Sequence, residues 1–273
     1  METAALQKVA RRVRFEAVRM IYEGKEGHPG PALSCADIVA TLYFDVMNIR
    51  PDQPDWEDRD RFILSKGHGC PIWYATLNER GYNNPKVEHF HLRELGSIFQ
   101  GHPSMHSGVP GIDMTTGSLG NGIAIGAGMA YAAKAHHKDY YTYVICGDGE
   151  MQEGVTWEGV NMAKGRGLDN LVVFVDNNGF QSYKTIEFTI GQNNMADRFR
   201  AFGWHTQEIN GHDVEQIKAA VTIAKATSGS PHAIICRTVK GKGLSYMENN
   251  NKWHKGVPTE EQWEITKREL GGE

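Results

Sequence analysis

The sequence predicts an α/β fold, a parallel sheet with helices on both faces. Short apolar runs alternate with longer segments of helical periodicity along most of the chain. Most of these runs are apolar at every position, which is typical of strands buried on both faces. Strands that alternate with helices in this way form parallel sheets. The 273 residues, 40% of them hydrophobic, are enough for a full core.

The first quarter of the chain predicts three helices and one strand. An apolar helical face runs through the first segment and ends at Gly24. After a loop, Ser34 is expected to cap a second helix, which continues to about residue 47. The run RFILS at 61–65 predicts a short buried strand. Pro71 then begins a third helix, and Gly81 ends it.

The rest of the chain predicts four further strands separated by helices. Residues 101–128 are rich in Gly, Pro, Ser and His and predict a long loop, followed by a tightly packed helix. The expected strands are 141–146, 171–176, 205–210 and 232–238, and the expected helices are 152–164, 194–202 and 213–227. A last helix is expected from Thr259, with Gln262 at the capping-box spacing. We expect a single domain over 1–273, with 241–273 as a C-terminal tail that contributes to the site.

Composition excludes several classes of function. The 29 Lys and Arg are outnumbered by 33 Asp and Glu, and a net charge of −4 argues against a nucleic-acid partner. No apolar segment approaches membrane-spanning length, and the N-terminus lacks the apolar core of a signal peptide. The four cysteines are scattered without a CxxC pair and predict reduced thiols. We therefore expect a cytoplasmic protein without a membrane partner.

An acid and an amide follow two neighbouring predicted strands. Asp148 stands in Gly-Asp-Gly after the first strand, and Asn178 ends Asp-Asn-Asn after the next. Ligands of such sheets bind beyond the carboxyl ends of the strands, and oxygen donors of this kind suit Mg²⁺ or Ca²⁺. Gly-Asp-Gly alone also fits a plain turn, but the second strand end makes a diphosphate-bound metal the stronger interpretation. The phosphate-binding pattern GxxxxGK[ST] does not occur in the chain.

Several linked motifs give the chain a resemblance to a known family. Gly-Asp-Gly followed by Asn-Asn about 30 residues later is similar to the thiamine diphosphate motif. Other stretches narrow the resemblance to the N-terminal part of transketolases, and they occur in that family's order over nearly the whole chain. These stretches are GHPG (27–30), LSKGHG (64–69), GHPS (101–104), PGIDMTTGSLGNGIA (110–124), GDGEMQEGVTWE (147–158), FGWHTQEINGHD (202–213) and RTVKGKGLSYMENNNKWH (237–254).

The resemblance implies a role for each matching residue. Asp148, Asn178 and the carbonyl of Phe180 would bind Mg²⁺, with Ca²⁺ as a substitute. The backbone of Gly149 would contact the diphosphate. The further residues that would line the cofactor are Gly117, Leu119, His68 and His254. The residues that would act in catalysis are His28, His68, His102, His254 and Glu153. The histidines suit this role because imidazoles exchange protons with sugar hydroxyls near neutral pH. Glu153 is included because the acid that matches it lies at the family's subunit interface.

The resemblance also implies a missing half. In the family, the acid that activates thiamine diphosphate and the groups that bind the sugar phosphate belong to a region that follows this one. We therefore expect the N-terminal subunit of a split transketolase of the pentose phosphate pathway, active as a heterotetramer with a separate C-terminal subunit. Two alternatives remain: a subunit of a deoxyxylulose phosphate synthase or 2-oxoacid dehydrogenase, and a non-catalytic cofactor-binding regulatory chain.

Overall fold

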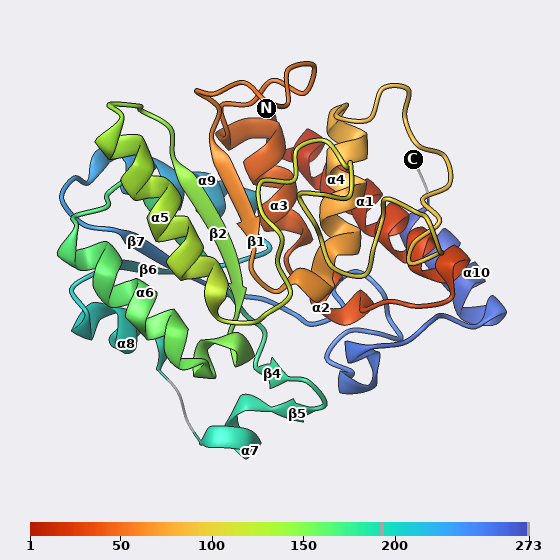
Figure 1. Ribbon diagram of the computed structural model, residues 1–273. Coiled ribbons are helices and arrows are strands. Elements are labelled where there is room, and N and C mark those ends of the chain that lie inside the picture. The colour runs from red at the N-terminus through yellow and green to blue at the C-terminus, as the bar shows by residue number, and fades with distance from the viewer. Residues whose placement is uncertain (192–193, 272–273) are drawn as a thin grey trace.

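A five-stranded parallel sheet forms the centre of the molecule (Figure 1). The structure, a computed structural model, describes residues 1–191 and 194–271. The strand order is β1-β2-β3-β7-β6, and every neighbouring pair is parallel. The strands are β1 (Arg61–Leu64), β2 (Thr142–Gly147), β3 (Leu171–Asn177), β6 (His205–Asn210) and β7 (His232–Arg237). This arrangement confirms the predicted fold class.

Helices cover both faces of the sheet because successive strand residues point to opposite sides. Phe62 packs into one core cluster, and the next residue, Ile63, packs into the other. The first face is covered by α1 (Thr3–Gly24), α3 (Ala36–Thr41), α4 (Cys70–Arg80) and α9 (Val214–Ala226). The second is covered by α5 (Asn121–Ala135), α6 (Gly154–Gly165) and α8 (Met195–Ala201). The two helical layers lie on either side of the strands in Figure 1.

Shorter elements gather near the carboxyl ends of the strands. Helix α2 (Pro29–Ser34) and two 3₁₀ turns, Gly67–Gly69 and Gly149–Gln152, lie there. An arm projects from the body below them, made of β4 (Phe180–Gln181), β5 (Lys184–Thr185) and α7 (Ile186–Ile190) (Figure 1). We name residues 180–191 the arm.

The tail returns to the N-terminal half and packs there. Its last helix, α10 (Glu260–Leu270), begins with the predicted capping box between Thr259 and Gln262. Trp263 stacks on Phe15 and Tyr22 of α1, with ring centroids 5.4 and 4.9 Å apart. Two backbone hydrogen bonds fasten the tail to the segment before and within α2: Gly241 N donates to Gly30 O, and Gly256 N donates to Gly27 O. A 3₁₀ turn at Asn251–His254 thereby lies beside α2.

Three local predictions were wrong. Ser34 does not cap the helix that follows; it is the last residue of α2, and its buried hydroxyl donates to Pro31 O and Asp176. After a break at Cys35 the chain forms α3 and then a π-helical turn at Leu42–Val46, so the expected continuous helix is interrupted. The glycine-rich loop ends earlier than expected, because α5 begins at Asn121. Small residues on both helices let α5 approach α6 closely. A Cβ at Gly159 of α6 would lie 2.8 Å from the backbone of Ala124 in α5.

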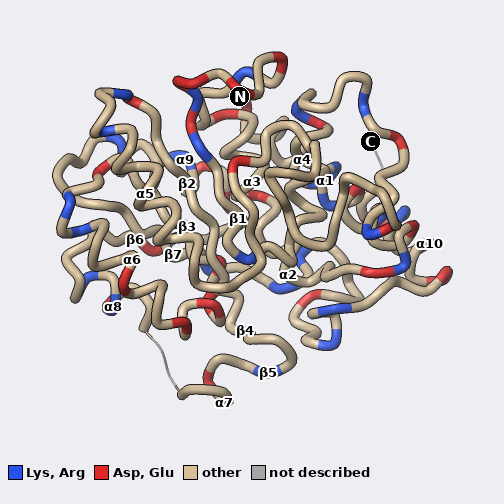
Figure 2. Tube along the Cα trace, in the orientation of Figure 1, with Lys and Arg blue, Asp and Glu red and all other residues tan. Residues whose placement is uncertain are grey.

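The cysteines, the charged residues and the helix lengths agree with what the composition predicts. All four cysteines are free and buried. Basic and acidic residues are interspersed along the trace (Figure 2). Within residues 1–191 and 194–271, no helix has both the length and the apolarity to cross a membrane.

Candidate active site

A pocket of about 330 Å³ opens where the carboxyl ends of the parallel strands meet α2, the arm and the tail. Every site residue predicted from the sequence lines it: His28, His68, His102, Gly117, Leu119, Asp148, Gly149, Glu153, Asn178, Phe180 and His254. Lys66, Glu150, Gln181 and Lys240 also line it. The fold thus brings together segments that are far apart in the sequence, as expected for ligand sites in such sheets.

Asp148 and Asn178 lie next to each other because β2 and β3 are neighbours in register. Gly147 pairs with Asp176, so both strands end at the same level. Asp148 is 2% exposed; its Oδ1 accepts from Gly149 N at 2.8 Å and its Oδ2 from Gly179 N at 2.6 Å. Burial, together with the nearby Asp176 carboxylate, raises the pKa of Asp148 to about 7. A bound cation would offset this cost, so the carboxylate fits a metal ligand.

The second predicted ligand is held by its own neighbours. Asn178 Nδ2 donates to Asp176 Oδ2 at 3.2 Å, and Asn178 Oδ1 accepts from Phe180 N at 3.1 Å. Together with Asp148, these residues supply one carboxylate, one amide oxygen and a backbone carbonyl, a donor set that suits Mg²⁺ or Ca²⁺ and leaves coordination positions for a diphosphate and water. Among the described residues no group of three or more His, Cys, Asp and Glu could hold a metal ion, so a zinc-type cluster is not found there.

Two glycines of the pocket, Gly149 and Gly117, have little room for a side chain. A Cβ at Gly149 would lie 2.9 Å from Gln181 Cγ. Gly117 has φ +140°, and a Cβ there would lie 2.8 Å from His102 Cδ2. Gln181 Oε1 is buried and has no hydrogen-bond partner within the protein. These features fit a ligand that approaches the backbone closely and donates a hydrogen bond to Gln181.

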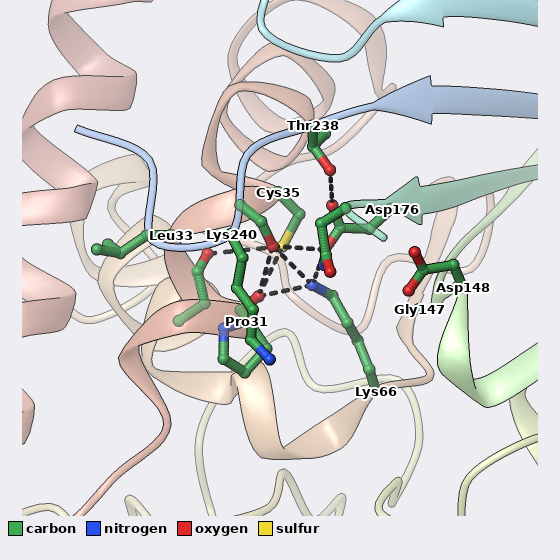
Figure 3. Close-up of polar contacts among 12 residues, drawn as sticks. Pro31, Leu33, Cys35, Lys66, Gly147, Asp148, Asp176, Thr238 and Lys240 are labelled. Atoms are coloured by element: carbon green, nitrogen blue, oxygen red, sulfur yellow. Dashed lines mark hydrogen bonds and ion pairs between the residues drawn. The ribbon is translucent and has the colours of Figure 1, made fainter. Parts of the chain in front are cut away.

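A buried ion pair forms the floor of the pocket (Figure 3). Lys66 Nζ contacts Asp176 Oδ2 and donates to Pro31 O at 2.6 Å. Although burial alone would lower the pKa of Lys66, the Asp176 carboxylate raises it, and Lys66 in turn keeps the pKa of Asp176 low against the opposite effect of burial. Both groups are therefore charged. Neither was predicted, because their sequence neighbours give no sign that they pair.

A third buried carboxylate, that of Glu150, organises the loops above the floor. Glu150 accepts hydrogen bonds from Ser65 Oγ, from Gly120 N at 2.8 Å and from Gly147 N at 3.1 Å. It therefore joins the end of β1, the start of α5 and the Gly-Asp-Gly turn. Its pKa is raised by burial. Glu153 lies just beyond it and packs against Gly120, where a Cβ would lie 2.4 Å from Glu153 Cβ.

Three of the four predicted histidines form a cluster. The ring centroids of His28, His68 and His254 lie 5.2 to 5.5 Å apart. Burial, aided by Lys255, lowers the pKa of His28 to about 4, and burial with Lys240 does the same for His254. Burial also lowers the pKa of His68 and that of His102, whose ring lies beside Gly117. The pocket therefore presents neutral imidazoles, which both donate and accept hydrogen bonds.

Lys240 joins the tail to the arm. Its buried Nζ donates to Ser182 O at 2.9 Å and to Asn251 Oδ1 at 2.7 Å, and it lies 3.3 Å from His254 Nδ1. Burial lowers the pKa of Lys240 to about 8. The motif VKGKG contains this residue, but only the folded tail shows that it reaches the pocket.

The fold and the pocket define a class of α/β protein whose ligand site lies beyond the carboxyl ends of parallel strands. Comparison with known proteins narrows this class. Residues 5–273 match the family model described as "Transketolase, thiamine diphosphate binding domain". The chain therefore belongs to the transketolase family, as its thiamine diphosphate binding domain.

Relatives of two lengths are similar to it. One of the subunits of the apulose-4-phosphate transketolase of Phocaeicola vulgatus is 44% identical over 270 residues, covering 99% of this chain and 94% of the relative. The 6-deoxy-6-sulfo-D-fructose transketolase subunit SqwG of a Clostridium species is 41% identical, covering 97% of this chain and 96% of the relative. The solved transketolase from Leishmania mexicana has a TM-score of 0.90 and 36% identity over 99% of this chain. This chain spans 42% of that structure.

Proposed function

We propose that the chain is the diphosphate-binding subunit of a two-component transketolase, which moves a two-carbon ketol unit from a ketose to an aldose. The observation that carries the proposal is one pocket with two parts. The Asp148–Asn178 pair and a cluster of neutral histidines both line it. The acid and the amide suit a metal-bound diphosphate, and neutral imidazoles suit both phosphate oxygens and sugar hydroxyls. The family match favours this function over the alternative thiamine diphosphate enzymes.

In this proposal, Asp148, Asn178 and the Phe180 carbonyl hold Mg²⁺, with Ca²⁺ as a substitute. The backbone of Gly149 and the rings of His68 and His254 face the diphosphate, and Gly117 and Leu119 lie along the cofactor. The 1–273 segment acts as a single domain whose tail, 241–273, supplies His254. Thiamine diphosphate, when bound, supplies the electron sink that lets the two-carbon unit leave the donor sugar.

The histidines hold and move protons in this proposal. His28 and His102 accept hydrogen bonds from sugar hydroxyls, and the four rings remain neutral at pH 7 because their pKa values lie below the usual range. A neutral imidazole accepts the proton that a donor hydroxyl loses and returns it to the acceptor.

The partner is a chain that carries the remaining transketolase region, including the side of the site that contacts the pyrimidine ring. The proposal is supported by two relatives that are named as subunits and have about the length of this chain. We propose a heterotetramer in which each site lies between chains, with Glu153 at the interface, in the cytoplasm and in pentose phosphate metabolism. Because one relative's name contains a phosphate and the other's a sulfo group, we propose a ketose with a terminal anionic group as the donor.

Cofactor titration tests the proposal. Two calorimetric titrations of thiamine diphosphate into the assembled complex are compared. One contains Mg²⁺, and the other contains an excess of chelator in place of the cation. Binding is expected to require the cation and to be lost in Asp148→Ala. Asp213→Ala is the matched control, because this acid caps α9 outside the pocket and its side chain accepts hydrogen bonds only from its own helix. Equal cofactor affinity in wild type and Asp148→Ala would contradict the proposal.

A further inference from the structure

Asp176 is the residue on which the pocket floor converges. It is fully buried, and each of its oxygens accepts from the protein. Oδ2 accepts from Ser34 Oγ, Lys66 Nζ and Asn178 Nδ2, and Oδ1 accepts from Thr238 Oγ1. The donors come from the end of α2, the segment after β1, the end of β3 and the segment after β7. Figure 3 shows Lys66 and Thr238 reaching this carboxylate from opposite sides.

A carboxylate fixes the orientation of an amide beside it. An ionised carboxylate only accepts hydrogen bonds, so the Asn178 group that faces Asp176 must be the NH₂. The Asn178 oxygen then points the other way, where it accepts from Phe180 N at 3.1 Å. Both the amide oxygen of Asn178 and the main chain of Phe180 belong to the proposed metal site. Asp176 thus sets the direction of one ligand and, through it, the position of the next.

The charge of Asp176 matters as much as its geometry. Lys66 Nζ lies against Asp176, and both residues are almost fully inaccessible to solvent. Removing the carboxylate charge alone would leave an uncompensated ammonium group in the pocket floor beside Asp148. A buried unpaired cation there repels a divalent cation strongly because water does not screen it.

We infer that Asp176 is a positioning residue for the metal site: it directs the Asn178 amide oxygen toward the cation and neutralises Lys66 beneath it. This inference rests on the proposed function, because it concerns the same cation. Residues that orient metal ligands in this way typically change metal affinity by about 10- to 100-fold when they are replaced. The role differs from that of a ligand, because Asp176 is enclosed by protein donors.

Two charge-balanced double variants separate orientation from charge. Lys66→Met with Asp176→Asn keeps an acceptor for the Asn178 amide, whereas Lys66→Met with Asp176→Leu removes it; neither leaves an unpaired charge. Mn²⁺ binding to the assembled complex with thiamine diphosphate is followed by electron paramagnetic resonance. We expect the Asn variant to bind Mn²⁺ within about threefold of wild type, and the Leu variant to bind it at least tenfold more weakly.

A single variant and a control complete the experiment. Asp176→Asn alone leaves the positive charge of Lys66 unpaired, so it should also weaken Mn²⁺ binding by at least tenfold. This variant keeps the inference testable if the Leu variant does not fold. Thr238→Val removes the hydrogen bond to the opposite oxygen and should lower the melting temperature without changing Mn²⁺ affinity. Wild-type Mn²⁺ affinity in Asp176→Asn, or in the Leu double variant, would overturn the inference but leave the proposed function standing. Absence of Mn²⁺ binding in wild type would overturn the proposed function and the inference with it.

Discussion

Replacing His212 with alanine should destabilise the protein and loosen the pocket. His212 lies in the turn between β6 and α9 and bridges two distant segments. Its Nδ1 lies 2.7 Å from Asp37 Oδ2, and its Nε2 accepts from Val239 N at 2.8 Å. Since the Val239 amide can only donate, the proton of the neutral ring must be on Nδ1 and faces Asp37. Asp37 is also paired with Arg14 of α1.

The expected loss follows from these two contacts. A hydrogen bond to a charged group contributes about 1.5–3 kcal/mol, and a buried amide left without a partner costs about 1–3 kcal/mol. Water can enter part of the space, because the His212 side chain is 14% exposed. We therefore expect His212→Ala to lower the free energy of unfolding by about 2–4 kcal/mol. Val239 precedes Lys240, so the affinity for thiamine diphosphate should also fall.

Urea denaturation followed by tryptophan fluorescence measures this loss. The neighbouring Asp213→Ala serves as the control, since it removes only the N-cap of α9 and should cost about 1 kcal/mol. A loss in His212→Ala no larger than that of Asp213→Ala would refute the bridging role. Unchanged cofactor affinity in a clearly destabilised His212→Ala would refute its link to Lys240.

Three further predictions concern the pocket and three histidines with lowered pKa values. Gly117→Ala should lower the free energy of unfolding by about 1–3 kcal/mol, because it places an L-residue at φ +140° against His102. Urea denaturation measures the loss, and an unaltered midpoint would contradict the prediction. Lys240→Met should weaken thiamine diphosphate binding by about tenfold, because the hydrogen bonds from the charged Nζ that hold the arm to the tail are lost. Calorimetry gives the affinity, and wild-type binding would count against this role. The free energy of unfolding should fall as pH decreases from 6.5 to 4, because the pKa values of about 4 for His28, His232 and His254 make the unfolded chain bind more protons than the folded chain in that window. Because His28 and His254 are partly exposed, solvent screening keeps their contributions well below the limit of about 1.4 kcal/mol per pH unit for one group. Urea melts at several pH values test this, and a flat profile would contradict it.

The fold could be predicted because its signals are local. Apolar runs mark the strands, and the motifs at their carboxyl ends mark where a ligand binds. The adjacency of Asp148 and Asn178 could be predicted in this way, since the parallel sheet brings the ends of β2 and β3 together. The interrupted helix at Cys35 was not found, because nothing in the local sequence distinguishes it from a continuous helix.

The floor of the pocket could not be predicted for a different reason. Asp176 is separated from Lys66 by 110 residues and from Ser34 by 142. In the sequence, Asp176 resembles any acid at a strand end, and Ser34 resembles a helix cap. Only the folded chain shows that buried donors converge on one carboxylate. The roles of the histidines also remain predictions, although the structure places all four around one pocket.

The most direct test of the central claim is a two-carbon transfer assay with purified components. The tagged chain is isolated from its native host together with any chain that co-purifies, and the two are then separated. Each is assayed alone and after recombination, with thiamine diphosphate and Mg²⁺. We expect ketol transfer only when both chains, the cofactor and the cation are present. Transfer by this chain alone at the full rate would contradict the claim, as would the absence of transfer in every combination.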